Sequence, residues 1–159
     1  MRKLFLMVSA VALAAPAHAD ANGDLTSLVN DYWADVLKEA PVFASSLGVD
    51  TYANEVGDYS LAASDRRAAS AAAFLKQLEA ISQAELNAAS KVEYGILART
   101  LKSTIEGNGF GQRSINFTTY SSWHQSFAGM ANNLPFKSKA DFESYNARLK
   151  QYGRVNDQS

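Results

Sequence analysis

The residues that could do chemistry in this chain are few. It has two histidines, His18 and His124, and no cysteine. The most recognisable zinc hydrolase site needs two histidines one helical turn apart with a glutamate between them, and no such pair occurs here. His124 alone could serve as a general base or a metal ligand. We favour a histidine that is hydrogen-bonded to the backbone beside Trp123.

Motifs for nucleophilic catalysis and phosphate binding are also absent. No serine lies in a Gly-x-Ser-x-Gly elbow after an expected strand. Gly107, Gly109 and Gly111 superficially resemble a phosphate-binding loop, but no strand precedes them and no Lys-Ser or Lys-Thr pair directly follows. We interpret these glycines as helix-terminating and turn positions. No catalytic, cofactor-binding or metal-ligating residue is therefore assigned in this chain.

Acidic residues recur at helical spacing in the first part of the chain. Asp31, Asp35 and Glu39 follow an i, i+4, i+8 series. Three such acids can bind a cation, but they lie off the expected apolar stripe, so a solvated outer face is the favoured interpretation. The pair Arg66-Arg67 is interpreted as solvated or salt-bridged.

The stretch 107–136 is the feature around which the rest of the chain is organised. It is rich in turn residues and lacks a sustained helical or strand period, whereas helical patterns flank it. Its aromatic residues are Phe110, Phe117, Tyr120, Trp123, Phe127 and Phe136. These are too many to remain in water, so we expect the loop to pack on the helices. Long ordered loops of this kind usually line a pocket, form a lid or fill a gap.

The rest of the chain predicts about five helices and an all-α fold, because strand signals are weak. Asp24, Ser60 and Ser138 are expected to cap helices over 25–39, 61–81 and 139–152. Pro41 starts a short apolar turn that Gly48 ends, and a further helix covers 88–106 until Gly107 and Gly109 stop it. Ser82 with Glu85 resembles a capping box that opens a short turn before the helix over 88–106, and Ser138 with Asp141 again resembles a helix start. The alanine run 68–73 allows a neighbouring helix to approach closely.

Apolar spacing predicts which residues of these helices face the core. Tyr32 and Trp33 are expected to be core anchors of the first helix. The other residues expected to lie inward are Val42, Phe43, Leu47, Leu75, Leu78, Ile81, Val92, Ile96, Leu97, Leu101, Ile105, Phe142, Tyr145, Leu149 and Tyr152. The stretch 154–159 shows no evident structural signal.

The N-terminus has the pattern of a secretory signal peptide over residues 1–19. Met1-Arg2-Lys3 is basic, residues 4–15 are apolar, and the small residues before Asp20 fit cleavage between Ala19 and Asp20. The apolar run is shorter than the roughly 20 residues needed to span a bilayer. We therefore expect an exported protein, periplasmic or secreted, with no stable membrane span after processing.

The composition excludes some partners and one kind of stabilisation. The net charge is −1 at pH 7 and no long run of either sign occurs, so no nucleic-acid-binding surface is implied. Because the chain has no cysteine, an exported form cannot be held by disulfides. Residues 20–159 are long enough to bury a core as a single domain.

Several segments together resemble the N-terminal portion of the bacterial domain-of-unknown-function 885 family. The segments are DYWADVLKEAPVFASSLGV (31–49), GDYSLAASDRRAA (57–69), EGNGFGQRSINFTTYSSWHQSFAGMANNLPF (106–136) and DFESYNARLKQYGRVNDQ (141–158). The Gly-Gln-Arg and Trp-His-x-Ser-Phe-Ala-Gly segments are the more specific parts. The resemblance covers essentially all of residues 20–159, in order.

The resemblance implies a longer exported helical protein that looks like a gluzincin-type zinc metallopeptidase. Its metal-binding His-Glu segment would lie downstream, so the zinc belongs to the full-length family and no catalytic residue carries over to this chain. On this interpretation residues 20–159 are a truncated N-terminal part. The positions that carry over as a candidate cleft or binding loop are Gln112, Arg113, Trp123, His124 and Phe127.

Two main functional hypotheses follow. In the first, the chain is the N-terminal fragment of a secreted zinc-dependent peptidase-like hydrolase, is not catalytic alone, and meets a peptide-like substrate only in a full-length form. In the second, it is a stand-alone periplasmic helical module that uses the aromatic loop as a ligand or partner surface. A third is a degenerate product without a role, which predicts poor solubility and non-cooperative melting.

Overall fold

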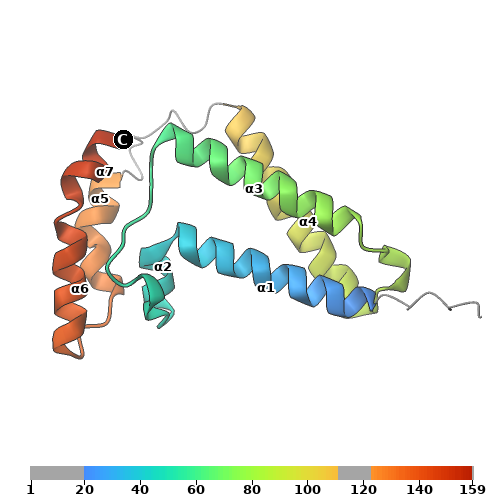
Figure 1. Ribbon diagram of the computed structural model, residues 1–159, viewed down its shortest axis with the longest axis horizontal. Coiled ribbons are helices and arrows are strands. Elements are labelled where there is room, and N and C mark those ends of the chain that lie inside the picture. The colour runs from blue at the N-terminus through green and yellow to red at the C-terminus, as the bar shows by residue number, and fades with distance from the viewer. Residues whose placement is uncertain (1–19, 111–122, 159) are drawn as a thin grey trace, which may run out of the picture.

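The computed structural model describes residues 20–110 and 123–158, and within these ranges every regular element is a helix (Figure 1). The α-helices are α1 (Ala21–Glu39), α2 (Pro41–Ser46), α3 (Leu61–Glu79), α4 (Ala88–Gly109), α5 (Trp123–Ala128), α6 (Lys139–Leu149) and α7 (Tyr152–Gln158). Short 3-10 turns are η1 (Asp50–Tyr52), η2 (Gln83–Glu85) and η4 (Gly129–Asn133). The all-α prediction is confirmed. The helices α5 and α7 come in addition to the elements expected from the sequence.

The helix starts follow the capping residues, with two corrections. Ser60 Oγ accepts from the Ala63 N–H at 3.1 Å, and Ser138 forms the predicted capping box with Asp141. The prediction that Asp24 caps α1 is wrong, because the carboxylate of Asp20 accepts from the Asn22 N–H and starts the helix one turn earlier.

The second correction concerns the capping box expected at Ser82. Ser82 makes no side-chain capping bond, so the capping box expected with Glu85 does not form, and a 3-10 turn follows. Asn87 caps α4 instead, accepting from the Ser90 N–H at 2.9 Å. The short turn expected before α4 is confirmed as η2.

Helices α1, α3 and α4 enclose the larger core. Leu25, Leu78 and Leu101 are fully buried at its centre, and Ala71 from the alanine run is buried with them. Helix α3 packs most extensively on α4. Helices α1 and α3 lie close together near η2 and diverge toward α2 (Figure 1). A cleft lies between their diverging ends, lined by residues of both helices.

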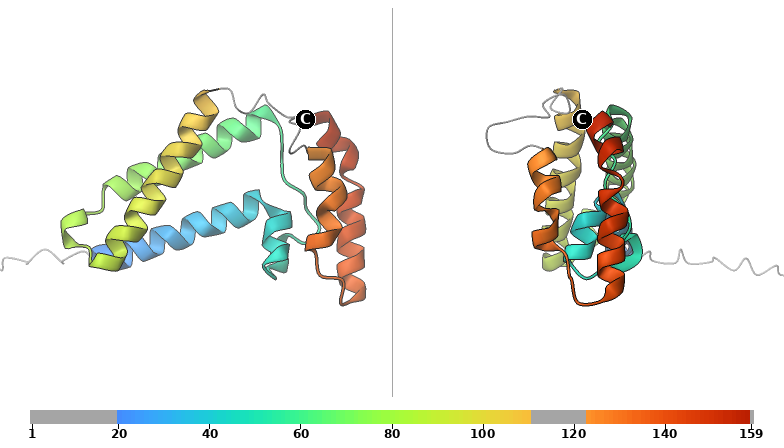
Figure 2. Two further views of the ribbon diagram at one scale, coloured as in Figure 1. Left: turned by 180° about the vertical axis from the view of Figure 1, so that it is seen from behind. Right: turned by 90° about the vertical axis from the view of Figure 1, so that its left-hand side faces the viewer.

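Helices α5, α6 and α7 form a second layer beside the open end of that arrangement (Figures 1 and 2). Met130 and Val155 of this layer are buried together with Val56 from the segment that connects η1 to α3. The rings of Phe127 and Tyr152 pack edge to face, with 5.1 Å between their centroids. A smaller core therefore joins the C-terminal helices to the connecting segment.

Several residues expected inside are exposed, which corrects the predicted apolar faces. The side chains concerned are Trp33, Phe43, Leu47, Val92, Ile96, Phe142, Leu149 and Tyr152. Trp33 is 45% exposed and packs edge to face on Phe43. The physical reason is that each helix is covered mainly on one side by its neighbours. Apolar residues toward its other side keep much of their surface exposed, even where one of them, such as Trp33 beside Phe43, touches a neighbouring ring.

The loop predicted over 107–136 is partly helical where the structure describes it. Helix α4 continues through Gly107 to Gly109, so Gly107 does not stop it. Residues 123–133 form α5 and η4, and Gly153 lies inside α7, which also takes up residues that gave no signal in the sequence. Gly48 ends α2 as predicted, with a φ of 80° that only glycine adopts readily.

Candidate ligand-binding cleft

A cleft of about 510 Å³ opens where α1 and α3 diverge. It is lined by Tyr32, Asp35, Val36, Glu39, Ala40, Pro41, Val42, Phe43, Gly57, Asp58, Tyr59, Arg67, Ala71 and Thr104. These residues come from α1, the start of α2, the segment before α3, α3 itself and α4. The cleft thus combines an apolar wall with a small number of charged groups.

One face of α1 supplies four of these residues. Tyr32, Asp35, Val36 and Glu39 are three, one and three positions apart, which places them on a single face of a helix. The sequence interpretation that Asp35 and Glu39 belong to a solvated outer face is therefore wrong. This face looks across the cleft to α3, whereas Asp31 is exposed.

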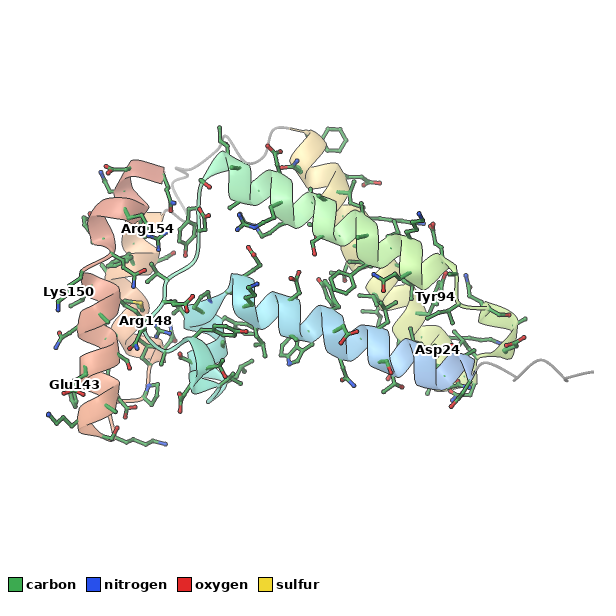
Figure 3. The ribbon with its side chains drawn as sticks, viewed as in Figure 1. Asp24, Tyr94, Glu143, Arg148, Lys150 and Arg154 are labelled. Carbon is green, nitrogen blue, oxygen red and sulfur yellow. The ribbon has the colours of Figure 1, made fainter. Side chains whose placement is uncertain are left out.

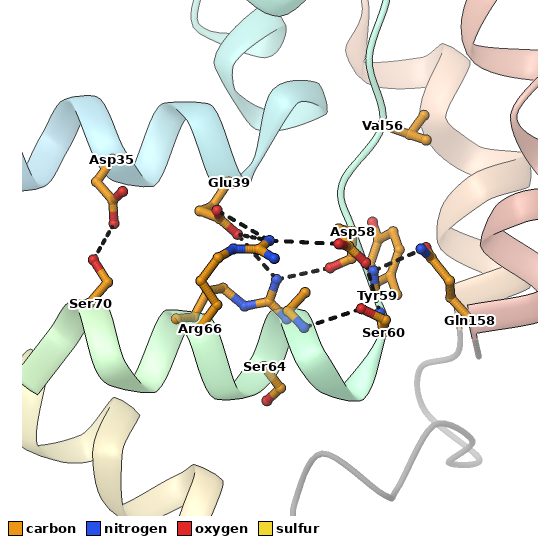
Figure 4. A network of polar contacts seen from close by, with 12 residues as sticks. Asp35, Glu39, Val56, Asp58, Tyr59, Ser60, Ser64, Arg66, Ser70 and Gln158 are labelled. Atoms are coloured by element: carbon orange, nitrogen blue, oxygen red, sulfur yellow. Dashed lines mark hydrogen bonds and ion pairs between the residues drawn. The ribbon is translucent and has the colours of Figure 1, made fainter.

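A network of ion pairs bridges the ends of α1 and α3 (Figure 4). Glu39 Oε2 lies 3.3 Å from Arg66 Nη2 and 3.4 Å from Arg67 Nη1. Arg66 Nη2 also lies 3.7 Å from Asp58 Oδ2, and Arg67 Nη1 donates to the Asp58 carbonyl at 2.9 Å. The prediction of a salt-bridged arginine pair is confirmed. Together these contacts hold the two helices at a fixed separation.

The network shifts the pKa of two of its members. The pKa of Arg66 is raised, first by its hydrogen bond to Glu39 and then by that carboxylate's charge. The pKa of the Asp58 carboxyl is lowered, chiefly because it accepts from the Ser60 N–H at 3.0 Å, with a smaller contribution from Arg66. Both shifts favour the charged forms of these two side chains.

Asp35 differs from the other carboxylates of the cleft. The hydroxyl of Ser70 donates to Asp35 Oδ2 at 3.0 Å, but no cation pairs with this carboxylate within the described part of the chain. Tyr32 lies one turn earlier, with its ring edge to face on Phe74 at 5.5 Å. Burial, and secondly the charge of Asp35, raise the pKa of the Tyr32 hydroxyl, which stays protonated. The cleft therefore carries one unpaired negative charge beside a phenol.

Arg148 is a second site that sequence reasoning missed. It is 1% exposed, and its Nη2 donates to the Pro41 carbonyl at 3.1 Å and to the Ser45 hydroxyl at 2.7 Å. It also donates to the carbonyls of Tyr52 and Glu55. Burial lowers the pKa of the guanidinium, and the charge of Asp50 opposes this. Because all four acceptors are neutral, Arg148 works as a structural tie between α6 and the segment that follows α1.

The tie continues along α6 and α7. Arg148 and Arg154 lie on the side of these helices that faces the segment 52–59 (Figure 3). The further bonds are Gln151 to the Asn54 carbonyl, Arg154 to the Val56 carbonyl, and the Tyr59 N–H to Gln158. Because residues 57–59 also line the cleft, the C-terminal layer positions one cleft wall.

The site residues predicted from the sequence lie elsewhere or outside the described ranges. Gln112 and Arg113 fall outside the described residues, and so do the side chains of Trp123 and His124, although their backbone belongs to α5. Phe127 packs in the smaller core and is not among the residues that line the cleft. The binding role of this loop stays a prediction.

The described residues also bear on two broader questions. In the ranges 20–110 and 123–158, no group of three or more histidine, cysteine or acidic residues is placed to hold a metal ion. No helix in the same ranges is long and apolar enough to cross a membrane.

Comparison with known proteins identifies the family. The sequence matches the family described as "Bacterial protein of unknown function (DUF885)" over residues 41–159. The chain belongs to this family. Neither the curated proteins nor the solved structures give a significant match to this DUF885 chain.

Only part of the cleft of this DUF885 protein lies inside the range that matches the family. Helices α2, α3 and α4 and the segment 57–59 lie inside the range, with Asp58 and Arg67. The face of α1 that carries Asp35 and Glu39 precedes it. The cleft is thus formed by the family region packed against a helix that the family match does not include.

Proposed function

We propose that this chain is the N-terminal, non-catalytic part of an exported zinc-dependent peptidase-like hydrolase, and that its cleft contributes one wall of the substrate site. The observation that carries the proposal is the cleft between α1 and α3 in a member of the DUF885 family. The hydrolase description itself comes from the sequence resemblance to a gluzincin-like protein.

The size and lining of the cleft suit part of a peptide. Its volume of about 510 Å³ falls within the range of about 300–1,000 Å³ that is typical of small-molecule sites. Val36, Pro41 and Val42 give it an apolar wall, and charged groups lie along one edge. This combination favours a ligand with apolar side chains and a few polar groups over a purely ionic one.

In this proposal the catalytic groups lie downstream of the present chain. In the proposed full-length enzyme, zinc bound by the downstream His-Glu segment would polarise a carbonyl and activate water. Residues of the present chain would bind and orient the substrate. The signal-peptide pattern of residues 1–19 supports export. The C-terminal layer keeps the cleft wall at 57–59 in place.

The size of the native product tests this division. An antibody against residues 20–158 is applied to a periplasmic extract, and we expect a band several times larger than the roughly 17.2 kDa of the full chain. The purified 159-residue chain is then assayed on peptides with and without zinc. Zinc-dependent turnover by this chain would show that the non-catalytic assignment is wrong. A native band at the size of the short chain would show that no downstream segment with a metal site is attached, and the proposal would be wrong.

A second function is favoured by one exposed aromatic residue. Phe110, at the end of α4 and the start of the aromatic stretch, is 86% exposed. Its exposure leaves one ring of the aromatic stretch accessible to a partner, as a stand-alone binding module that uses this stretch would require. If the cell keeps the short product, a Phe110→Ala variant should lose capture of partners from the periplasmic extract. Equal capture by both proteins would exclude this use of Phe110.

A further inference from the structure

We propose that the cleft binds a protonated amine carried on an apolar body, with Asp35 as the counter-ion. The inference names the class of ligand for the proposed binding wall. It rests on the proposed function only in assuming that the cleft binds substrate. The chemistry is that of an alkylammonium group next to apolar side chains, as at the amino terminus of a peptide or on a lysine side chain.

The charges around the cleft favour a cation. Its lining carries Asp35, Glu39, Asp58 and Arg67, with Arg66 at the edge. Glu39 and Asp58 form ion pairs with Arg66 and Arg67, so these four charges balance. The remaining charge is that of Asp35, whose only hydrogen-bond partner in the described ranges is the neutral hydroxyl of Ser70. An anionic ligand would have to displace a carboxylate from the arginines.

The polar groups next to Asp35 suit an ammonium group. Ser70 uses Oδ2 of Asp35, which leaves Oδ1 for a ligand. The Tyr32 hydroxyl lies on the same helix face one turn away and has no hydrogen-bond partner in the described parts of the chain. An ammonium has three N–H donors and no acceptor, so a carboxylate oxygen and a phenol oxygen can both accept from it.

The apolar wall supplies the other half of the recognition. Val36, Pro41, Val42 and Phe43 line the cleft beyond Asp35, toward α2. Phe43 is 44% exposed, and its ring packs edge to face on that of Trp33. A ligand that places its amine at Asp35 can cover these side chains with its apolar part and remove them from water.

Calorimetric titration of the purified chain with defined peptides tests the inference. The probes are leucyl-phenylalanine amide, its N-acetylated form, and N-acetyl-alanyl-lysyl-alanine amide. We expect the free dipeptide amide to bind about tenfold more tightly than its acetylated form, because acetylation removes a charged hydrogen bond. Comparison with the lysine peptide tells an amino terminus from a side-chain amine as the source of the ammonium. The preference should weaken as salt is raised.

Matched variants locate the effect. Asp35→Asn keeps an acceptor for Ser70 but removes the charge, and it should weaken binding of the free amine about tenfold. Asp31→Asn removes the same charge from the same helix outside the cleft and should change nothing. Ser70→Ala removes the hydrogen bond but keeps the charge, so amine binding should persist. Circular dichroism melting checks that each variant is folded.

The outcomes separate this inference from the proposed function. Equal binding of the free and acetylated dipeptides overturns the amine inference and leaves the cleft as a peptide wall. Equal weakening by Asp35→Asn and Asp31→Asn also overturns it, because the effect is then that of the overall charge. If no probe binds, both the amine inference and the use of the cleft as a binding wall are wrong, whatever the size of the native product.

Discussion

Arg148 Nη2 lies 3.1 Å from the carbonyl oxygen of Pro41, although the two residues are 107 positions apart in the chain. This bond joins α6 to the first turn of α2 at a point where both residues are buried. The same guanidinium holds the segment that leads to the cleft wall. The C-terminal layer and the cleft are therefore mechanically connected.

Removing the guanidinium should destabilise the fold. Arg148→Met keeps an unbranched side chain but leaves buried carbonyl oxygens without a donor, so we expect a loss of about 3 kcal/mol in the free energy of unfolding. Urea titration measures it. Lys150→Met, an exposed position at the end of α6, is the control and should change little. A loss no larger than that of the control would show that Arg148 does not stabilise the contact between α6 and the segment that follows α1.

The ion-pair bridge should contribute modestly to stability. Glu39→Gln removes the charge that Arg66 and Arg67 share, and because Arg66 is half exposed we expect a loss of only about 0.5–1 kcal/mol. The difference from the unmodified protein should shrink in high salt. Urea titrations at low and high salt measure both effects. A loss that is independent of salt would contradict an electrostatic origin.

The lowered pKa of Asp58 predicts a loss of stability in acid. Because the carboxyl has a lower pKa in the folded chain than the ordinary value of about 3.9, its contribution is present above that value and is lost as the pH falls through the folded pKa. Asp58→Asn should therefore flatten the acid limb of a plot of stability against pH. Glu85→Gln, an exposed position in η2, serves as control. Identical acid limbs for the protein and Asp58→Asn would contradict the prediction.

Two serines with similar sequence signals should respond differently to the same substitution. Ser138→Ala removes a formed capping box and should cost about 1 kcal/mol of unfolding free energy. Ser82→Ala should cost much less, because Ser82 makes no capping bond. Thermal melting of both variants measures the contrast. Similar shifts of the melting temperature would show that capping is not the cause.

The sequence by itself determined α1 to α4 and α6 and most of their limits, but not α5 and α7. Ser60, Pro41 and Gly48 act through contacts within a few residues, so local chemistry is sufficient to predict them. The family was also recognisable from short segments of the chain, and the match over 41–159 confirms it. What these signals share is that they do not depend on how distant parts of the chain pack.

Only the tertiary structure decided which faces are covered and where the cleft lies. Leu97 is buried and Ile96 is exposed, although both suited the predicted apolar face of α4. Asp35 was assigned to the solvent but faces α3 across the cleft, and Arg148 gave no apolar signal at all. The physical reason is that burial and pairing depend on which distant element packs against a helix face. Helical periodicity describes one helix at a time and does not contain that information.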